Sequence, residues 1–198
     1  MDKKQIQEER TRGYFVEATK NILRSEGVKG ISVRSIADAA GYSFATLYNY
    51  FRDVRELIFI CVGDFRQEAS EWITQKTMAA KPGLPRIEAL AMAYADYFVE
   101  YPGIFQLFFI EKLNEISNSQ QTAGLVYNFL SDLCTTDCEV ATVSGQLGNE
   151  ELKHRIELIN NLVAGALLFY LNRISPPSYT DFRTSLQKQV AMIVQGKG

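Results

Sequence analysis

Residues 43–51, SFATLYNYF, concentrate aromatic rings, hydroxyl groups and one amide in a stretch without a single charge. Hydroxyl and amide groups exchange hydrogen bonds, whereas aromatic rings offer apolar faces. A segment of this chemistry suits a buried core, a helix that docks a partner, or a surface that reads nucleic acid. The residues around it must decide between these three uses.

Metal binding and catalysis have little support elsewhere in the chain. The three cysteines include one pair at positions 134 and 138, and His154 is the only imidazole, whereas metal sites normally need three or four ligands. The chain also lacks a glycine-rich phosphate loop, a G-x-S-x-G segment and an H-E-x-x-H segment. We therefore expect no metal, no cofactor, no catalytic residue and no enzymatic activity.

The composition is that of a globular protein. The chain has 198 residues, of which 46% are hydrophobic, enough for a substantial core. Its first ten residues, MDKKQIQEER, are mostly charged or polar, and no apolar run approaches the roughly 20 residues that cross a bilayer. We expect no signal peptide, no membrane span and, from the odd number of cysteines, a cytoplasmic location.

The elements that position residues 43–51 are expected to be helices. Apolar residues recur at spacings of three and four, and no segment alternates like a strand. The pattern predicts one helix over Thr11–Ser25, a second that begins after Ser32 and ends at Gly41, and a third that Ser43 caps. The protein should be all-α.

The rest of the chain also has helical periodicity. Pro82, Gly83 and Pro85 should end the first long helix of this part. The polar stretches NEISNSQQ and EVATVSGQLGN are expected to be loops. The predicted helices are Val54–Met78, Arg86–Glu100, Pro102–Glu111, Gln121–Leu133, Glu150–Arg173 and Thr180–Gln195.

Helical geometry separates the side chains of residues 43–51 into two faces. Leu47, Tyr50 and Phe51 share the face that can pack on the preceding helix. The opposite face carries Phe44, Ala45, Tyr48 and Asn49. Two short helices joined by a glycine turn, with a third helix behind them, form a helix-turn-helix arrangement. Residues 1–55 hold ten Lys and Arg against seven Asp and Glu, whereas the remainder is acidic. This asymmetry suits a polyanion partner at the N-terminal part, or it is a chance fluctuation in solvated charge.

The stretch ISVRSIADAAGYSFATLYNYFRDVRELI resembles the DNA-binding head of the TetR family of bacterial transcription regulators. The similarity covers roughly Thr11 to Ile58. It implies an N-terminal three-helix helix-turn-helix head over residues 1–55 and a C-terminal helical domain over 56–198 that binds an effector and forms a homodimer. It further implies a ligand-responsive repressor that binds a palindromic, double-stranded operator and leaves it when a small molecule binds.

The resemblance also implies which residues contact DNA. Phe44 could press on a thymine methyl group and Asn49 could hydrogen-bond adenine, while Arg10 and Arg12 could reach the backbone or minor groove. Phe44 stands where relatives often carry lysine or a small polar residue, and Val54 where they often carry lysine, so Arg55 or Arg52 should supply the missing phosphate contact. The full expected set is Arg34, Ser43, Phe44, Ala45, Thr46, Tyr48, Asn49 and Arg55.

Aromatic residues are dense in the segment YADYFVEYPGIFQLFF, residues 94–109. Such density can line a pocket between helices for a hydrophobic or aromatic effector, although each ring alone could equally fill the core. The expected effector-binding residues are Phe65, Tyr94, Phe98, Phe105, Phe109 and Tyr127.

The segment LVAGALLFYL, residues 162–171, is apolar around its whole circumference. A helix that is hydrophobic on every side must be covered on every side, which favours a second subunit over a monomeric core. The expected dimer interface consists of Leu162, Ala164, Gly165, Ala166 and Phe169.

Two alternatives stay open. The protein could bind DNA under the control of a protein partner or without an effector. It could also be an all-helical ligand-binding protein or enzyme that does not bind DNA, and salt-dependent duplex binding separates that class from the others.

Overall fold

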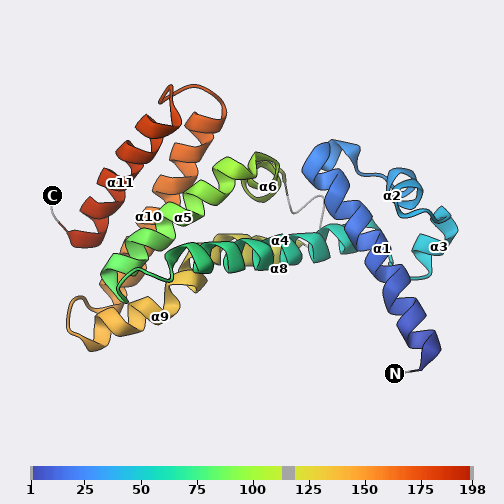
Figure 1. Ribbon diagram of the computed structural model, residues 1–198, viewed down its shortest axis with the longest axis horizontal. Coiled ribbons are helices and arrows are strands. Elements are labelled where there is room, and N and C mark those ends of the chain that lie inside the picture. Colours follow the sequence, from blue (N-terminus) through green and yellow to red (C-terminus); the bar gives the residue numbers. More distant parts are fainter. Residues whose placement is uncertain (1, 113–118, 197–198) are drawn as a thin grey trace. The chain divides into compact units, whose positions relative to one another are not determined.

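The computed structural model describes residues 2–112 and 119–196, and every element in these ranges is helical (Figure 1). The predicted all-α class is confirmed. The chain divides into two compact units, the first formed by Met1–Arg66 with Gly103–Val126 and the second by Gln67–Pro102 with Tyr127–Gly198. The predicted division into 1–55 and 56–198 stays a prediction.

The first helix, α1, spans Lys3–Ser25 and so begins well before the predicted start at Thr11. Residues 3–10 are exposed on every side, and apolar periodicity therefore gave no signal for them. Polar contacts support this turn instead, because Gln5 Oε1 accepts a hydrogen bond from the Asp2 N–H at 3.1 Å and Lys4 pairs with Glu8 at 3.9 Å.

A single cluster of apolar side chains holds the N-terminal helices together. After α1 come a 3₁₀ turn, η1, at Val28–Gly30, then α2 at Val33–Ala40 and α3 at Phe44–Tyr48. The buried members of the cluster are Phe15, Ile22, Ile36, Leu47, Phe51 and Leu57. This packing confirms the predicted face of Leu47 and Phe51.

The long helix α4 spans Val54–Thr77, within one residue of the prediction. Its start is capped, because Asp53 Oδ1 accepts a hydrogen bond from the Glu56 N–H at 2.9 Å. Glu56 Oε2 in turn accepts from the Arg52 N–H at 2.9 Å. The two units of the chain divide within this helix.

The middle of the chain departs from the predicted helices. The expected helix Pro102–Glu111 is a short α6 at Pro102–Phe105 followed by a π-helical turn, η2, at Gln106–Ile110.

The predicted helix Gln121–Leu133 is wrong as a single element. It is interrupted at Asn128, whose φ of −84° and ψ of 0° separate α8 at Ser119–Tyr127 from α9 at Phe129–Val143. The expected loop EVATVSGQLGN is wrong over its first half, because α9 runs through Val143. The other expected loop, NEISNSQQ, lies outside the described residues up to position 118.

The second unit is a bundle of α5 at Leu84–Glu100, α9, α10 at Asn149–Leu171 and α11 at Tyr179–Gln195. Each of α9 and α11 packs on both α5 and α10, and α10 and α11 run side by side (Figure 1). The predicted bounds of α10 and α11 are confirmed to within two residues.

One buried carboxylate joins α9 to the start of α5. Asp137 is only 2% exposed. Its Oδ1 accepts a hydrogen bond from the Gly83 N–H at 2.8 Å, and Arg86 Nε donates to Oδ2 at 2.8 Å. Gly83 has φ of +92°, a conformation that side chains disfavour. Asp137 therefore fixes the turn that precedes α5.

We expect Asp137→Asn to lower the free energy of unfolding by about 2 kcal/mol, because a hydrogen-bonded charge is lost from a buried site. Urea unfolding followed by circular dichroism measures the change. Glu139→Gln, an exposed substitution on the same helix, should leave stability within about 0.5 kcal/mol. Equal stability of the two variants would contradict the role given to Asp137.

Candidate functional site

The turn between α2 and α3 is set by local hydrogen bonds and one glycine. Ser32 Oγ accepts from the Ser35 N–H at 3.0 Å and caps α2. At the other end Gly41 adopts φ of +75° and ψ of +27°, and the Tyr42 N–H donates to the Ala37 carbonyl at 3.0 Å. The chain can therefore change direction over the three residues between α2 and α3.

The helix α3 is only five residues long and depends on its caps. Ser43 Oγ accepts a hydrogen bond from the Thr46 N–H at 3.1 Å, and the two hydroxyl groups lie 2.8 Å apart. Ser43 thus has a structural role that comes before any contact with a partner. Its hydroxyl keeps further hydrogen-bonding capacity, since an –OH group has one donor and two acceptor positions.

Leu47 divides α3 into an inner and an outer side. Leu47 is completely buried, whereas Phe44 is 60% and Tyr48 53% exposed. Phe44 and Tyr48 are four residues apart and thus adjacent on the helix surface. Ala45 and Asn49, also exposed, follow the same spacing. We call these four residues the outer face of α3.

The other residues expected to contact DNA lie in the same unit. Arg34 on α2 and Arg55 on α4 are exposed, and Thr46 is half-buried. Together with Ser43 and the outer face of α3, they give this part of the unit hydroxyl, amide, aromatic and guanidinium groups. Such a set can hydrogen-bond phosphate oxygens and contact base edges.

Arg12, for which a backbone or minor-groove contact is expected, also makes contacts within the protomer. Its guanidinium lies 4.7 Å from the centroid of the Phe51 ring and 3.7 Å from Glu56 Oε1. Arg12 Nη1 also donates to the Tyr50 carbonyl at 3.4 Å. These contacts tie α1 to the segment that leaves α3, so Arg12 positions the outer face of α3.

Acidic residues border one side of Asn49. A surface cleft there is lined by Gln5, Glu8, Glu9, Arg12, Asn49 and Tyr50. The carboxylates of Glu8 and Glu9 would repel a phosphate backbone. A polyanion should therefore approach Asn49 from the side away from the start of α1.

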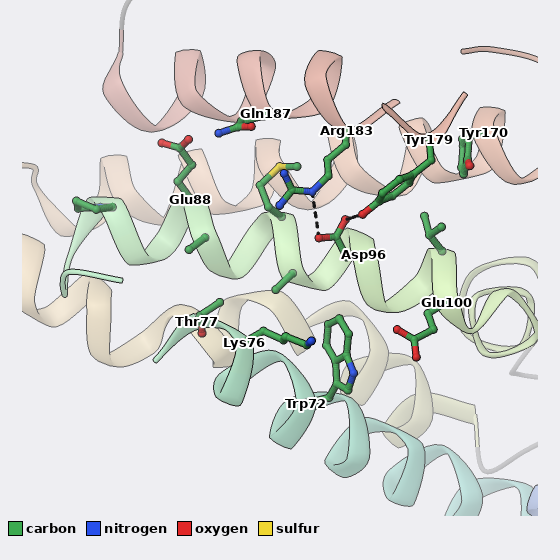
Figure 2. A pocket seen from close by; sticks show the side chains of 15 residues that line it. Trp72, Lys76, Thr77, Glu88, Asp96, Glu100, Tyr170, Tyr179, Arg183 and Gln187 are labelled. Carbon is green, nitrogen blue, oxygen red and sulfur yellow. Dashed lines mark hydrogen bonds and ion pairs between the residues drawn. The ribbon is translucent and has the colours of Figure 1, made fainter. Parts of the chain in front are cut away.

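The second unit contains a cleft of about 690 Å³ (Figure 2). It lies between the end of α4, one face of α5 and the first half of α11. We call it the Asp96 cleft because Asp96 accepts two hydrogen bonds there. Its lining residues are Trp72, Lys76, Thr77, Pro85, Glu88, Ala89, Met92, Ala93, Asp96, Val99, Glu100, Tyr170, Tyr179, Arg183 and Gln187.

A polar network joins the two walls of the Asp96 cleft. The Tyr179 hydroxyl donates to Asp96 Oδ1 at 2.8 Å, and Arg183 Nε donates to Asp96 Oδ2 at 3.3 Å (Figure 2). Burial raises the pKa of Tyr179, and the hydrogen bond to Asp96 raises it further. The phenol therefore stays protonated at neutral pH and remains a donor.

The six residues expected to bind an effector do not line this cleft. Phe65, Phe105 and Phe109 belong to the first unit, whereas Tyr94, Phe98 and Tyr127 belong to the second. Four of the six are almost completely buried: Phe65, Tyr94, Phe98 and Phe105.

Ring packing accounts for the buried positions in this set. Tyr94, for example, packs edge-on against Phe98 and Phe129 at centroid distances of 4.9 and 5.3 Å. Aromatic density in the sequence therefore marked packed rings, since core and pocket select the same residue types.

Sequence reasoning missed the polar residues of the Asp96 cleft. A usable signal was present, because Glu88, Asp96 and Glu100 repeat at four- and eight-residue spacings on α5. Tyr179 and Arg183 are likewise four residues apart on α11. Polar residues on one face of an otherwise apolar helix indicate that this face is in contact with water.

The residues expected at a dimer interface lie on α10 but on more than one side of it. Leu162, Gly165 and Phe169 follow a spacing of three and four, and Leu158 extends the row by one turn. Leu158 and Phe169 are 42% and 53% exposed, although both are apolar. Ala164 and Ala166 flank this row.

The cysteines are free thiols. Burial raises the pKa of Cys61 to about 12 and also raises the pKa of Cys134. Both stay protonated at neutral pH, so neither is a reactive thiolate. Within residues 2–112 and 119–196, no three His, Cys, Asp or Glu side chains gather as metal ligands do, and no helix there has the length and apolarity of a membrane span.

Known proteins resemble both the N-terminal segment and the whole fold. Residues 15–59 match the profile of bacterial regulatory proteins of the tetR family. The HTH-type transcriptional regulator PksA of Bacillus subtilis (strain 168) is 32% identical over 87 residues, which are 44% of this chain. The match spans only 42% of PksA.

Solved structures reproduce the fold over nearly the full length. A TetR transcriptional regulator from Rhodococcus sp. RHA1 has a TM-score of 0.66 at 15% identity, over 96% of this chain and 100% of that one. The regulator FadR from Bacillus subtilis, in complex with stearoyl-CoA, has a TM-score of 0.72 at 11% identity, over 94% and 100% of the two chains. At these identities the likeness establishes the fold alone.

The profile match covers the capped turn, the buried Leu47 and the outer face of α3, and the fold around them is that of TetR regulators. The N-terminal segment of the chain is therefore similar to the tetR family of bacterial regulatory proteins.

Proposed function

We propose that the protein is a dimeric transcription regulator that binds a palindromic operator in the bacterial cytoplasm and releases it when a small molecule binds. The protein represses transcription, and it acts by binding DNA rather than by catalysing a reaction. The operator contacts are made by Arg34, Ser43, Phe44, Ala45, Thr46, Tyr48, Asn49 and Arg55.

The exposure of Phe44 and Tyr48 beside the buried Leu47 carries this proposal. Two adjacent aromatic rings that are more than half exposed form an unusual surface for a monomer in water. In a major groove the same rings meet thymine methyl groups and sugar–phosphate edges, while Asn49 can pair with adenine. The absence of charge in residues 43–51 suits contacts that discriminate bases, and Arg34 and Arg55 supply attraction to phosphate.

Dimerisation provides the two reading heads that a palindrome needs. The row Leu158, Leu162, Gly165 and Phe169 can pack on its copy in a second chain, and Gly165 permits close approach of the backbones. Two heads held in this way must enter major grooves about 34–36 Å apart. A ligand that favours a different separation would weaken binding, and a coupling of about 1–3 kcal/mol corresponds to about 5- to 150-fold.

Selection of binding sites from random duplexes tests the proposal directly. We expect an inverted repeat with half-sites about one helical turn apart and A·T pairs at the positions that Phe44 and Asn49 contact. A selected site without symmetry would contradict the dimeric mechanism. If the protein binds no duplex even at low salt, the alternative function of an all-helical ligand-binding protein would be favoured.

We expect Tyr48→Ala to weaken binding to the selected operator by at least about tenfold, because a base-edge or phosphate contact is lost from each head. Fluorescence anisotropy at fixed salt measures this change. The melting temperature should stay nearly constant, since Tyr48 is 53% exposed. Tyr127→Ala removes an equally exposed ring from the second unit and serves as the control. Equal affinities of the two variants would remove Tyr48 from the interface.

We expect Phe169→Glu to weaken self-association by about thirtyfold or more, since it places a charge where an apolar contact is proposed. Sedimentation equilibrium reports the dissociation constant, and circular dichroism should show unchanged helicity because Phe169 is 53% exposed in the protomer. Thr135→Glu, an exposed change on α9, should leave the assembly intact. A parent protein that is monomeric at micromolar concentration would contradict this interface.

A further inference from the structure

We propose that the Asp96 cleft binds a small organic cation with an aromatic body, such as an aryl ammonium compound. Binding is inferred from the cleft alone, and its effect on DNA rests on the function proposed above. The volume of about 690 Å³ lies within the usual range of small-molecule sites.

The charges that line the Asp96 cleft favour a positive ligand. Three carboxylates, from Glu88, Asp96 and Glu100, face two cationic side chains, Lys76 and Arg183. Asp96 and Arg183 neutralise each other through their hydrogen bond. Glu88 and Glu100 form no ion pair with another described residue, and three carboxylates against two cationic side chains leave the lining with a net charge of −1.

The aromatic wall offers a second site of attraction for a cation. Trp72 lines the cleft from α4 together with Tyr170 from α10 and Tyr179 from α11. Lys76 Nζ already lies 5.2 Å from the centroid of the Trp72 ring, and Figure 2 shows the two side chains next to each other. The protein therefore places an ammonium group on this ring, and tryptophan is the side chain on which cations bind best. Because Lys76 is exposed and flexible, a ligand cation can take its place.

The floor of the cleft accommodates the apolar part of the ligand. Ala89, Met92 and Ala93 lie on α5 between the carboxylates, and Met92 is 5% exposed. An aromatic ring laid on these side chains can direct its charged group towards Glu100 and Trp72. Figure 2 shows both residues at the same end of the cleft.

Ligands of other charge are disfavoured by the same residues. An anion would meet Glu88 and Glu100, and the guanidinium of Arg183 is already paired with Asp96. A neutral aromatic molecule would leave both free carboxylates uncompensated. A partly exposed ion pair predicts a preference of up to about fivefold for the cation, because its contact with Trp72 replaces the one that Lys76 makes and adds little.

Intrinsic tryptophan fluorescence can measure ligand binding to this cleft. Trp72 is the only tryptophan, so intrinsic fluorescence reports on the Asp96 cleft without a label. We expect benzyltrimethylammonium to change the emission in a saturable way and to bind about fivefold more tightly than benzyl alcohol or phenylacetate. Titration calorimetry on the same full-length protein gives the affinities independently of fluorescence. Equal affinities for the three probes, or no binding of the cation, would overturn the proposal.

Two matched variants test whether the probe binds in the Asp96 cleft. Glu100→Gln should weaken binding of benzyltrimethylammonium about fivefold, since it removes a carboxylate that faces the ligand. Glu71→Gln should have no effect, because Glu71 lies on α4 outside the cleft and bonds Gln67. An unchanged affinity in Glu100→Gln would contradict the assigned position of the charged group.

The DNA step is measured separately on the selected operator. If benzyltrimethylammonium binds the free protein and also lowers operator affinity, the cleft is the effector site. If it binds and operator affinity is unchanged, the ligand class stands and the release mechanism proposed above fails. Should no operator be found, binding to the free protein still decides the ligand class.

Discussion

The burial of Leu47 is the constraint on which the outer face of α3 depends. A helix of five residues has too few hydrogen bonds to be stable alone. Its orientation is imposed by one completely buried leucine, which packs in the cluster with Phe15, Ile36 and Phe51. Burial of a leucine side chain contributes about 2 kcal/mol, which would be lost if α3 turned another side towards the cluster. With Leu47 inward, Phe44 and Tyr48 must point to solvent.

Side chains around α3 hold the helix in this orientation. Ser43 closes the start of the helix through Thr46, and Arg12 holds the exit through Glu56 and the Tyr50 carbonyl. None of these contacts uses the outer side chains of α3. A partner therefore meets rings and an amide that were positioned before it arrived, which limits the entropy lost on binding.

Apolar periodicity predicted the elements that pack through one face and missed those held by other forces. Helices α4, α10 and α11 were predicted within about two residues because each has a regular buried stripe. The start of α1 was missed because residues 3–10 are stabilised by exposed polar pairs. The break at Asn128 was missed because asparagine is compatible with both a helix interior and a turn.

The candidate sites differed in how far they could be predicted, for a physical reason. Residues of α3 were predictable because inner and outer positions follow from a single helix. The Asp96 cleft draws its side chains from α4, α5, α10 and α11, and their meeting depends on how four helices pack. Aromatic content alone does not separate a pocket from the core, since Tyr94 and Phe98 pack against each other in the core while polar residues line the cleft.

The two surfaces differ in charge, and this difference restricts how they can communicate. Residues 56–198 hold sixteen Asp and Glu against eleven Lys and Arg, so this acidic part disfavours polyanions and attracts cations. The Asp96 cleft belongs to the second unit, whereas the residues proposed to contact DNA belong to the first. Any effect of such a ligand on DNA must therefore pass through a change in the equilibrium between conformations, in which the ligand binds one arrangement of the helices around Asp96 more tightly than another.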